Sequence, residues 1–254
     1  MLADADRAVR PMTEPVAAAD AVVRAVPRLC RAVLRRPSRR PRRHDGDVAR
    51  LAVLAVPVAV PVTMAGVFAL FGRLLSPRAA HLAGFAVYWA GWCGAFPVWV
   101  LGLRGCRDVL GAGRRPRPAE LAVLALPVVG AVATELVPNR RLVGLRVALV
   151  AAGTAAVNAL GEELLWRGLF LDRFPGDQMR AGIWPLAGFT VWHLAPQLVR
   201  PSDRGRGGFL AGAATVGTVM TVVAWRAGGV RAVLLPHVLV DACGVRVARF
   251  WTGR

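Results

Sequence analysis

Long apolar runs separated by short charged segments dominate the chain from residue 51 onward. A helix needs roughly 20 apolar residues to cross the hydrocarbon core of a bilayer. Four runs of about this length contain no Arg, Asp or Glu, namely 51–72, 82–103, 181–199 and 207–225. Each is predicted to cross a membrane as one helix.

Three further runs are shorter or carry polar residues. Run 121–134 lies between Glu120 and Glu135, whose side chains can reach the membrane interface. Runs 142–170 and 230–245 contain acidic and basic side chains within an otherwise apolar sequence. We predict that these runs also cross, which gives about seven spans, or eight if part of a terminal region inserts.

The fold class follows from the continuity of the runs. They do not alternate between apolar and polar residues, as the strands of a membrane β-barrel do. In lipid, every backbone N–H and C=O must be paired within the protein, so the remaining spanning structure is a helix. The predicted class is therefore all-α, a multi-spanning transmembrane helical bundle.

Composition agrees with a membrane protein, since 56% of the residues are hydrophobic and 19% are charged. The 33 basic residues are all Arg and outnumber 15 acidic residues, which gives a formal net charge of +18. The use of Arg without Lys is typical of a GC-rich coding sequence. We expect the protein in a bacterial cell (inner) membrane. Most Arg residues flank apolar runs and no nucleic-acid-binding motif occurs, so nucleic acid is not an expected partner.

Residues 1–48 differ from the rest of the chain. Twelve Arg and no apolar run occur in the first 50 residues, so no cleavable signal peptide is predicted and this segment is expected in the cytoplasm. Apolar residues and Arg residues between 22 and 35 recur on separate faces, which favours a basic amphipathic helix, although Pro27 would break or kink it. Residues 49–254 are predicted to form the membrane domain.

Ionisable side chains inside a span cost roughly 2.5–3.5 kcal/mol each, so they persist where they face one another or a cavity. Glu163 and Arg167 are four residues apart, in the order that favours an ion pair along one helix face. Glu162 has no such partner on its own helix, and an unpaired carboxylate is suited to act as a general base.

Two histidines fall within predicted spans. His193 lies near the middle of run 181–199, and His237 precedes Asp241 by one helical turn. Taken singly, each can be a hydrogen-bonded core residue. Together with Glu162 and Glu163 they favour one shared site. Crossing at each run from a cytoplasmic N-terminus brings this site toward the cytoplasmic face, where we expect it to open.

Three motifs follow one another along the chain: EExxxR (Glu162, Glu163, Arg167), FxxxH (Phe189, His193) and HxxxD (His237, Asp241). In this order, over roughly residues 120–250, they resemble the CPBP family of intramembrane glutamic endopeptidases. These are relatives of the type II CAAX prenyl endopeptidase, also called the ABI family. In that family the last motif often ends in Asn, whereas this chain has Asp241.

The resemblance implies that Glu162 and His193 activate a water molecule for attack on a peptide carbonyl. It implies that His237 and Asp241 stabilise the oxyanion. Supporting roles fall to Glu163, Arg167 and Phe189. The expected substrate is a membrane-associated protein or peptide, and no cofactor or metal is implied. The residues themselves agree, since no Ser or Cys lies beside these histidines as a nucleophile.

Three other functions remain open from the residues alone. Glu162, His193 and His237 can supply a zinc site of two histidines and one carboxylate, although no HExxH motif is present. A non-catalytic immunity, scaffold or substrate-capture protein would be indicated by loss of these residues, which are all present. A proton-coupled transporter also uses Glu and His within the membrane, but the runs show no inverted repeat.

Overall fold

The computed structural model of the chain describes residues 47–245. The predicted basic segment 1–48, with its amphipathic helix, therefore lies almost wholly outside the described residues. Within 47–245 the structure is helical and contains no strand. The predicted all-α class is confirmed.

Five long helical rods match five of the predicted spans in length and apolar composition. In order they are α2 (Asp47–Leu74), α3 to α4 (Pro77–Gly111), α5 to α6 (Pro118–Asn139), α7 to α8 (Leu145–Arg173) and α10 (Gly205–Ala227). The helix continues beyond the predicted span 82–103 as far as Gly111, because α4 (Phe96–Gly111) resumes after a kink at Gly102. Gly102 has φ 69°, which glycine adopts readily.

The other two predicted spans form shorter helices. Segment η5 (Met179–Ile183) and α9 (Trp184–Trp192) make one rod, and α11 (Arg231–Ala242) makes the other. The prediction that 181–199 is one span with His193 near its middle was wrong. Pro196 has no N–H to donate to the carbonyl of Trp192, so Ala195 bonds that carbonyl at 2.9 Å and the helix ends.

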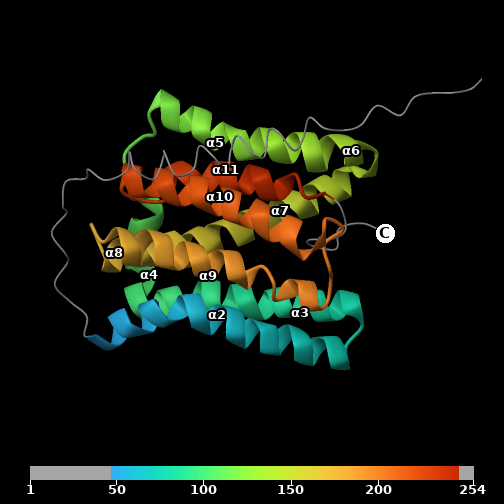
Figure 1. The fold of residues 1–254 in the computed structure, drawn as a ribbon, viewed down its shortest axis with the longest axis horizontal. Helices are drawn as coiled ribbons and strands as arrows, with labels where there is room; N and C mark the ends of the chain where they lie inside the picture. The colour runs from blue at the N-terminus through green and yellow to red at the C-terminus, as the bar shows by residue number, and fades with distance from the viewer. Residues whose placement is uncertain (1–46, 246–254) are drawn as a thin grey trace, which may run out of the picture. The chain divides into compact units, whose positions relative to one another are not determined.

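The end of α7 (Leu145–Glu163), with Glu162 and Glu163, is buried inside the bundle. Helix α11 packs along α7, and α2 packs against α3 (Pro77–Val87) and α9, as Figure 1 shows. Large apolar side chains such as Val62, Leu126, Leu149 and Leu235 are more than half exposed. An apolar outer surface of this kind suits contact with lipid.

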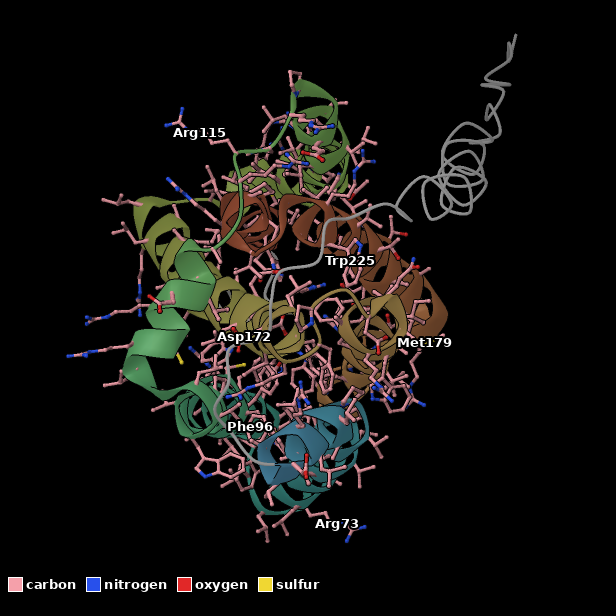
Figure 2. All side chains as sticks on the ribbon, turned by 90° about the vertical axis from the view of Figure 1, so that its left-hand side faces the viewer. Arg73, Phe96, Arg115, Asp172, Met179 and Trp225 are labelled. Carbon is pink, nitrogen blue, oxygen red and sulfur yellow. The ribbon has the colours of Figure 1, made fainter. Side chains whose placement is uncertain are left out.

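Charged side chains are found at the ends and edges of the bundle. In Figure 2, which looks from one end of the view in Figure 1, Arg73 and Arg115 point away from the helices. A few polar side chains are instead buried within the bundle. They lie around the end of α7, where Asn158, Glu162 and Glu163 are all buried.

Candidate active site

The two acidic residues of the first motif lie where α7 passes into the π-helical segment η4 (Leu164–Gly168). Glu162 is 1% exposed, Glu163 is 0% exposed, and every residue of η4 is buried. Single π-helical turns inside a helix often occur at functional sites. The carboxylates therefore enter the core of the bundle rather than its lipid-facing surface.

Glu162 is held by aromatic donors from two other elements. Its Oε1 atom accepts hydrogen bonds from the Tyr88 hydroxyl at 3.2 Å and from the Trp192 indole at 3.0 Å. Tyr88, the first residue of the π-helical segment η1 (Tyr88–Ala95), accepts in turn from the Trp166 indole at 2.8 Å. The Tyr88 and Trp192 rings are stacked with centroids 3.8 Å apart. These contacts fix the direction in which the carboxylate points.

His193 caps the C-terminal end of α9, and its ring has one defined tautomer. Nδ1 lies 2.7 Å from the carbonyl oxygen of Phe189. A carbonyl only accepts, so Nδ1 carries the proton and Nε2 of the neutral ring is an acceptor. The backbone carbonyl of His193 also accepts from the Gln197 amide at 3.1 Å. The histidine is thus anchored at both its ring and its main chain.

Glu163 and His237 form the centre of a second, fully enclosed group. Oε1 of Glu163 accepts from Arg167 Nη1 at 2.9 Å and from His237 Nδ1 at 2.7 Å. On the other side of its ring, His237 Nε2 lies 3.6 Å from Glu162 Oε2 and 3.7 Å from Asp241 Oδ2. His237 therefore connects all three carboxylates.

Arg167 connects Glu163 of α7 with helices α9 and α10. Its Nε donates to the Thr221 hydroxyl at 3.3 Å, and Nη2 donates to the Gly217 carbonyl at 3.4 Å, both on α10. The guanidinium lies 4.3 Å above the Phe189 ring of α9. Since Phe189 also holds His193 through its carbonyl, the ion pair with Glu163 is linked to the position of that histidine.

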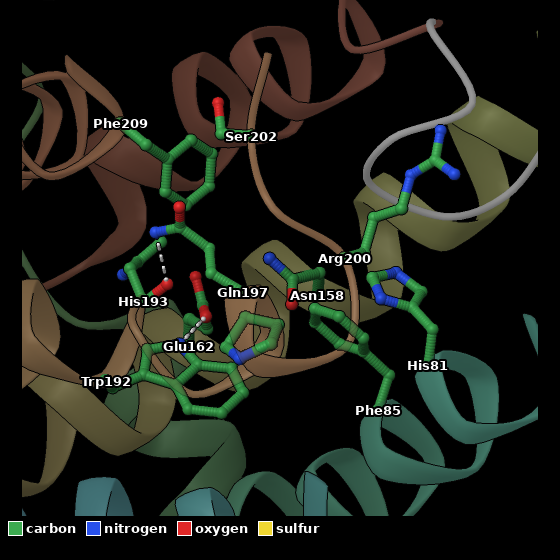
Figure 3. Close-up of a pocket in the computed structure, with 11 residues that line it drawn as sticks. His81, Phe85, Asn158, Glu162, Trp192, His193, Gln197, Arg200, Ser202 and Phe209 are labelled. Carbon is green, nitrogen blue, oxygen red and sulfur yellow. Dashed lines mark hydrogen bonds between the residues drawn. The ribbon is translucent and has the colours of Figure 1, made fainter. Parts of the chain in front are cut away.

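A pocket of about 530 Å³, including its open mouth, gives access to part of this network. Its lining includes Asn158 and Glu162 of α7, Trp192 and His193 at the end of α9, and His81 of α3. In Figure 3 the Glu162 carboxylate and the His193 side chain lie on the same side of the pocket. A carboxylate and a neutral imidazole facing one cavity can together orient and deprotonate a water molecule.

The pocket opens at one end of the bundle. In the helix that runs from Leu145 to Arg173, Glu162 is nearer to Arg173. The outer part of the pocket, in contrast, is lined by the start of α3 and by Arg200 and Ser202, which lie between α9 and α10. In Figure 1 these segments are at the opposite end from the first turn of α2 and from α8 (Leu169–Arg173). From the sequence, we expected the site to open on the same side as the N-terminal segment, which is the end where α2 begins. For this pocket that expectation was wrong, because the pocket opens where the chain leaves the helix after α9.

Residues 144–243 match a family model described as Rce1-like, type II CAAX prenyl endopeptidase Rce1-like. This segment is an Rce1-like domain. No curated protein and no solved structure matches the chain. The matched segment runs from α7 to α11 and contains all three motifs, so it confirms the family that the motifs indicated. This match also supports the interpretation that the protein is a protease.

The Rce1-like domain brings all seven predicted site residues into one contact network. Two of them, Glu162 and His193, line the pocket. The remaining five lie outside its described lining and are joined to these two by hydrogen bonds, ion-pair contacts and ring contacts: Glu163, Arg167, Phe189, His237 and Asp241.

Several residues in this network were not predicted from the sequence. Asn158 lies one turn before Glu162 on α7, so helical spacing alone offered a signal for it. Trp166 and Trp192 are next to motif residues, but an indole near a motif is not distinctive. Tyr88 lies in an apolar run far from the motifs, and no local signal marks it.

The zinc hypothesis required Glu162, His193 and His237 to act together as ligands. Among residues 47–245, no group of three or more His, Cys, Asp or Glu side chains is arranged to hold a metal ion. The residues present therefore do not fit this site.

Proposed function

We propose that the protein is an intramembrane endopeptidase that hydrolyses a peptide bond of a membrane-associated protein or peptide. The observation that carries this proposal is the shared pocket of Glu162 and His193, two titratable side chains buried in the helical bundle with fixed orientations. The Rce1-like match supports the same reaction class.

Glu162 acts as the general base in this proposal. Two neutral donors, Tyr88 and Trp192, orient its Oε1 atom, and His237 Nε2 lies 3.6 Å from its Oε2 atom. His193 presents Nε2 as an acceptor, which is suited to hold the second hydrogen of the same water. Both groups are enclosed, so the water molecule is activated away from bulk solvent.

In the proposed reaction, a C–O bond to the water oxygen forms, the peptide C–N bond breaks, and Glu162 carries one proton from the water to the leaving amine. The water oxygen attacks the peptide carbonyl carbon as Glu162 takes a proton, and a tetrahedral oxyanion forms. Glu162 then gives this proton to the amide nitrogen as the C–N bond breaks. The products are a new carboxyl end and a new amine.

The decisive experiment compares wild type with Glu162→Gln in detergent micelles. Two internally quenched peptides serve as probes, each ending in Cys-aliphatic-aliphatic-X, one S-farnesylated and one not, because the family name specifies a CAAX prenyl endopeptidase. An amide fills the same space but cannot accept the proton, so we expect cleavage to fall by about 10³-fold or more, with unchanged elution of the protein.

Equal cleavage by wild type and Glu162→Gln would reject the glutamate mechanism. Loss of wild-type activity on chelation, restored by zinc, would favour the metalloprotease alternative instead. A proteomic comparison of membrane peptides from cells with wild type or Glu162→Ala identifies the natural substrate, and unchanged peptides would favour a non-catalytic protein.

We further propose that residues 49–254 form the membrane domain and that residues 1–48 lie in the cytoplasm of a bacterial cell. The Arg excess of the N-terminal segment supports this orientation. The Rce1-like match and the apolar helices support a multi-pass membrane protein without fixing the side on which the chain begins.

A further inference from the structure

Asn158 lines the same pocket as Glu162 and has no role in the chemistry described so far. It lies one helical turn before Glu162 on α7 and is 1% exposed. Figure 3 shows it in the middle of the pocket wall, between His193 and Glu162 on one side and His81 and Arg200 on the other. A buried polar side chain in such a position requires hydrogen-bond partners.

Two partners fix the orientation of the Asn158 amide. Its Oδ1 accepts from the Trp89 indole at 2.9 Å, and its Nδ2 donates to Asp241 Oδ2 at 2.8 Å. An indole N–H only donates and an ionised carboxylate only accepts, so the oxygen and nitrogen cannot be exchanged. Nδ2 carries two N–H bonds, and Asp241 takes one of them.

The proposed hydrolysis needs a donor at the carbonyl oxygen, where negative charge develops. Asp241 is poorly placed for this role, because it does not belong to the described lining of the pocket and its Oδ2 atom accepts from Asn158. A neutral amide next to the general base has the right charge and the right location.

We propose that Asn158 donates its second N–H to the carbonyl oxygen of the scissile peptide bond, an inference that rests on the proposed function. Asp241 is then a positioning residue, which orients the amide through its carboxylate. In the resembled family the last motif often carries Asn. In this chain the amide is on α7 and its carboxylate partner on α11.

Removing the donor should slow the chemical step rather than weaken binding. We expect Asn158→Ala to lower kcat by about 10²- to 10³-fold on the two quenched CAAX peptides, the usual effect of losing an oxyanion donor. KM should change by less than about threefold, because the contact forms mainly in the transition state. The matched control is Asn139→Ala, the other asparagine of the chain, which bonds the Glu135 carbonyl away from the pocket.

Variants at Asp241 test its positioning role. Asp241→Asn retains an oxygen that accepts from Asn158, so kcat should remain within about threefold of wild type. Asp241→Ala removes the partner and should cost roughly 10- to 100-fold, as for residues that orient the ligands of a metal site. Loss of activity in Asp241→Asn equal to that of Glu162→Gln would overturn this role.

The exchange variant Asn158→Asp/Asp241→Asn separates a catalytic from a structural asparagine. It restores one amide–carboxylate pair, so thermal stability in detergent should recover relative to Asn158→Asp alone. The amide then sits at position 241, outside the described pocket lining, so kcat should stay at least about 10²-fold below wild type. Recovery of kcat to within about threefold would show a purely structural pair and overturn the inference.

The outcome is independent of the general-base test. If Glu162→Gln is inactive while Asn158→Ala keeps wild-type kcat, the proposed function stands and this inference fails. If wild type cleaves neither peptide in a Glu162-dependent manner, both fail together.

Discussion

At the scale of single residues, Tyr88 has the most direct contact with the proposed base from outside the Rce1-like domain. We expect Tyr88→Phe to keep the stacked ring on Trp192 but to lose the hydrogen bond to Glu162. The resulting fall in kcat should be about 10- to 150-fold, which corresponds to one hydrogen bond to a charged group. Steady-state kinetics on the quenched peptides measure it.

The comparison variant is Tyr88→Leu, which loses both the hydroxyl and the ring that stacks on Trp192. It should be less stable as well as less active. If Tyr88→Phe is as unstable as Tyr88→Leu, the hydroxyl acts mainly on folding rather than on the orientation of the carboxylate.

The pair of Glu163 and Arg167 is expected to act on stability. Both side chains are buried, and Arg167 also bonds α10, so Arg167→Met leaves the Glu163 carboxylate in the core with His237 but without its guanidinium partner. Loss of one partner of a buried ion pair costs about 3–5 kcal/mol. We expect a lower folded yield and a lower Tm in detergent. A variant with wild-type stability and no activity would instead place Arg167 in the reaction.

At the scale of elements, the contact between α9 and α2 sets the position of the second motif. Gly188 makes this close approach, because an added Cβ would lie 2.5 Å from the Cα and Cβ atoms of Pro57 and 2.9 Å from the Trp166 ring. Only a residue without a side chain lets the two helices meet here.

We therefore expect Gly188→Ala to destabilise the protein by about 1–3 kcal/mol, the usual cost of overpacking. It should also lower kcat, since the displaced helix carries Phe189, Trp192 and His193. The control is Gly153→Ala on α7, where an added Cβ meets nothing within 4 Å. That change should be neutral or stabilising by up to about 1 kcal/mol. Equal effects of the two substitutions would contradict the proposed close contact.

At the scale of the whole molecule, the pocket mouth and the turn after α8 lie at opposite ends of the described helices. Cysteines introduced as Ser202→Cys and Asp177→Cys should react with a membrane-impermeant thiol reagent from opposite faces of the membrane. Cys93, Cys106 and Cys243 are buried and give little background. Cys30, which lies outside the described residues, is replaced by Ser in both variants. Intact cells and inverted vesicles provide the two faces.

This experiment also decides the side on which the site opens. If residues 1–48 are cytoplasmic, Asp177→Cys reacts from the cytoplasm and Ser202→Cys from outside. The reverse pattern would place the start of α2 outside and the pocket in the cytoplasm. Labelling of both from one face would contradict the arrangement of the helices.

The sequence by itself determined the class of fold and the family. Runs of about 20 apolar residues predict membrane helices without knowledge of neighbouring segments, because length and hydrophobicity are local properties. The three motifs likewise depend only on residue type and spacing along single helices. The pair of Glu163 with Arg167, and a shared location for Glu162 and His193, could therefore be predicted.

Only the tertiary structure decided which side chains meet. The bonds from Tyr88 to Glu162, from Trp192 to Glu162 and from Asn158 to Asp241 join residues 30 to 83 positions apart. No helical period links such residues, since their contact depends on how separate helices pack. The end at which the pocket opens depends in the same way on where α9 breaks and on which helices surround the break.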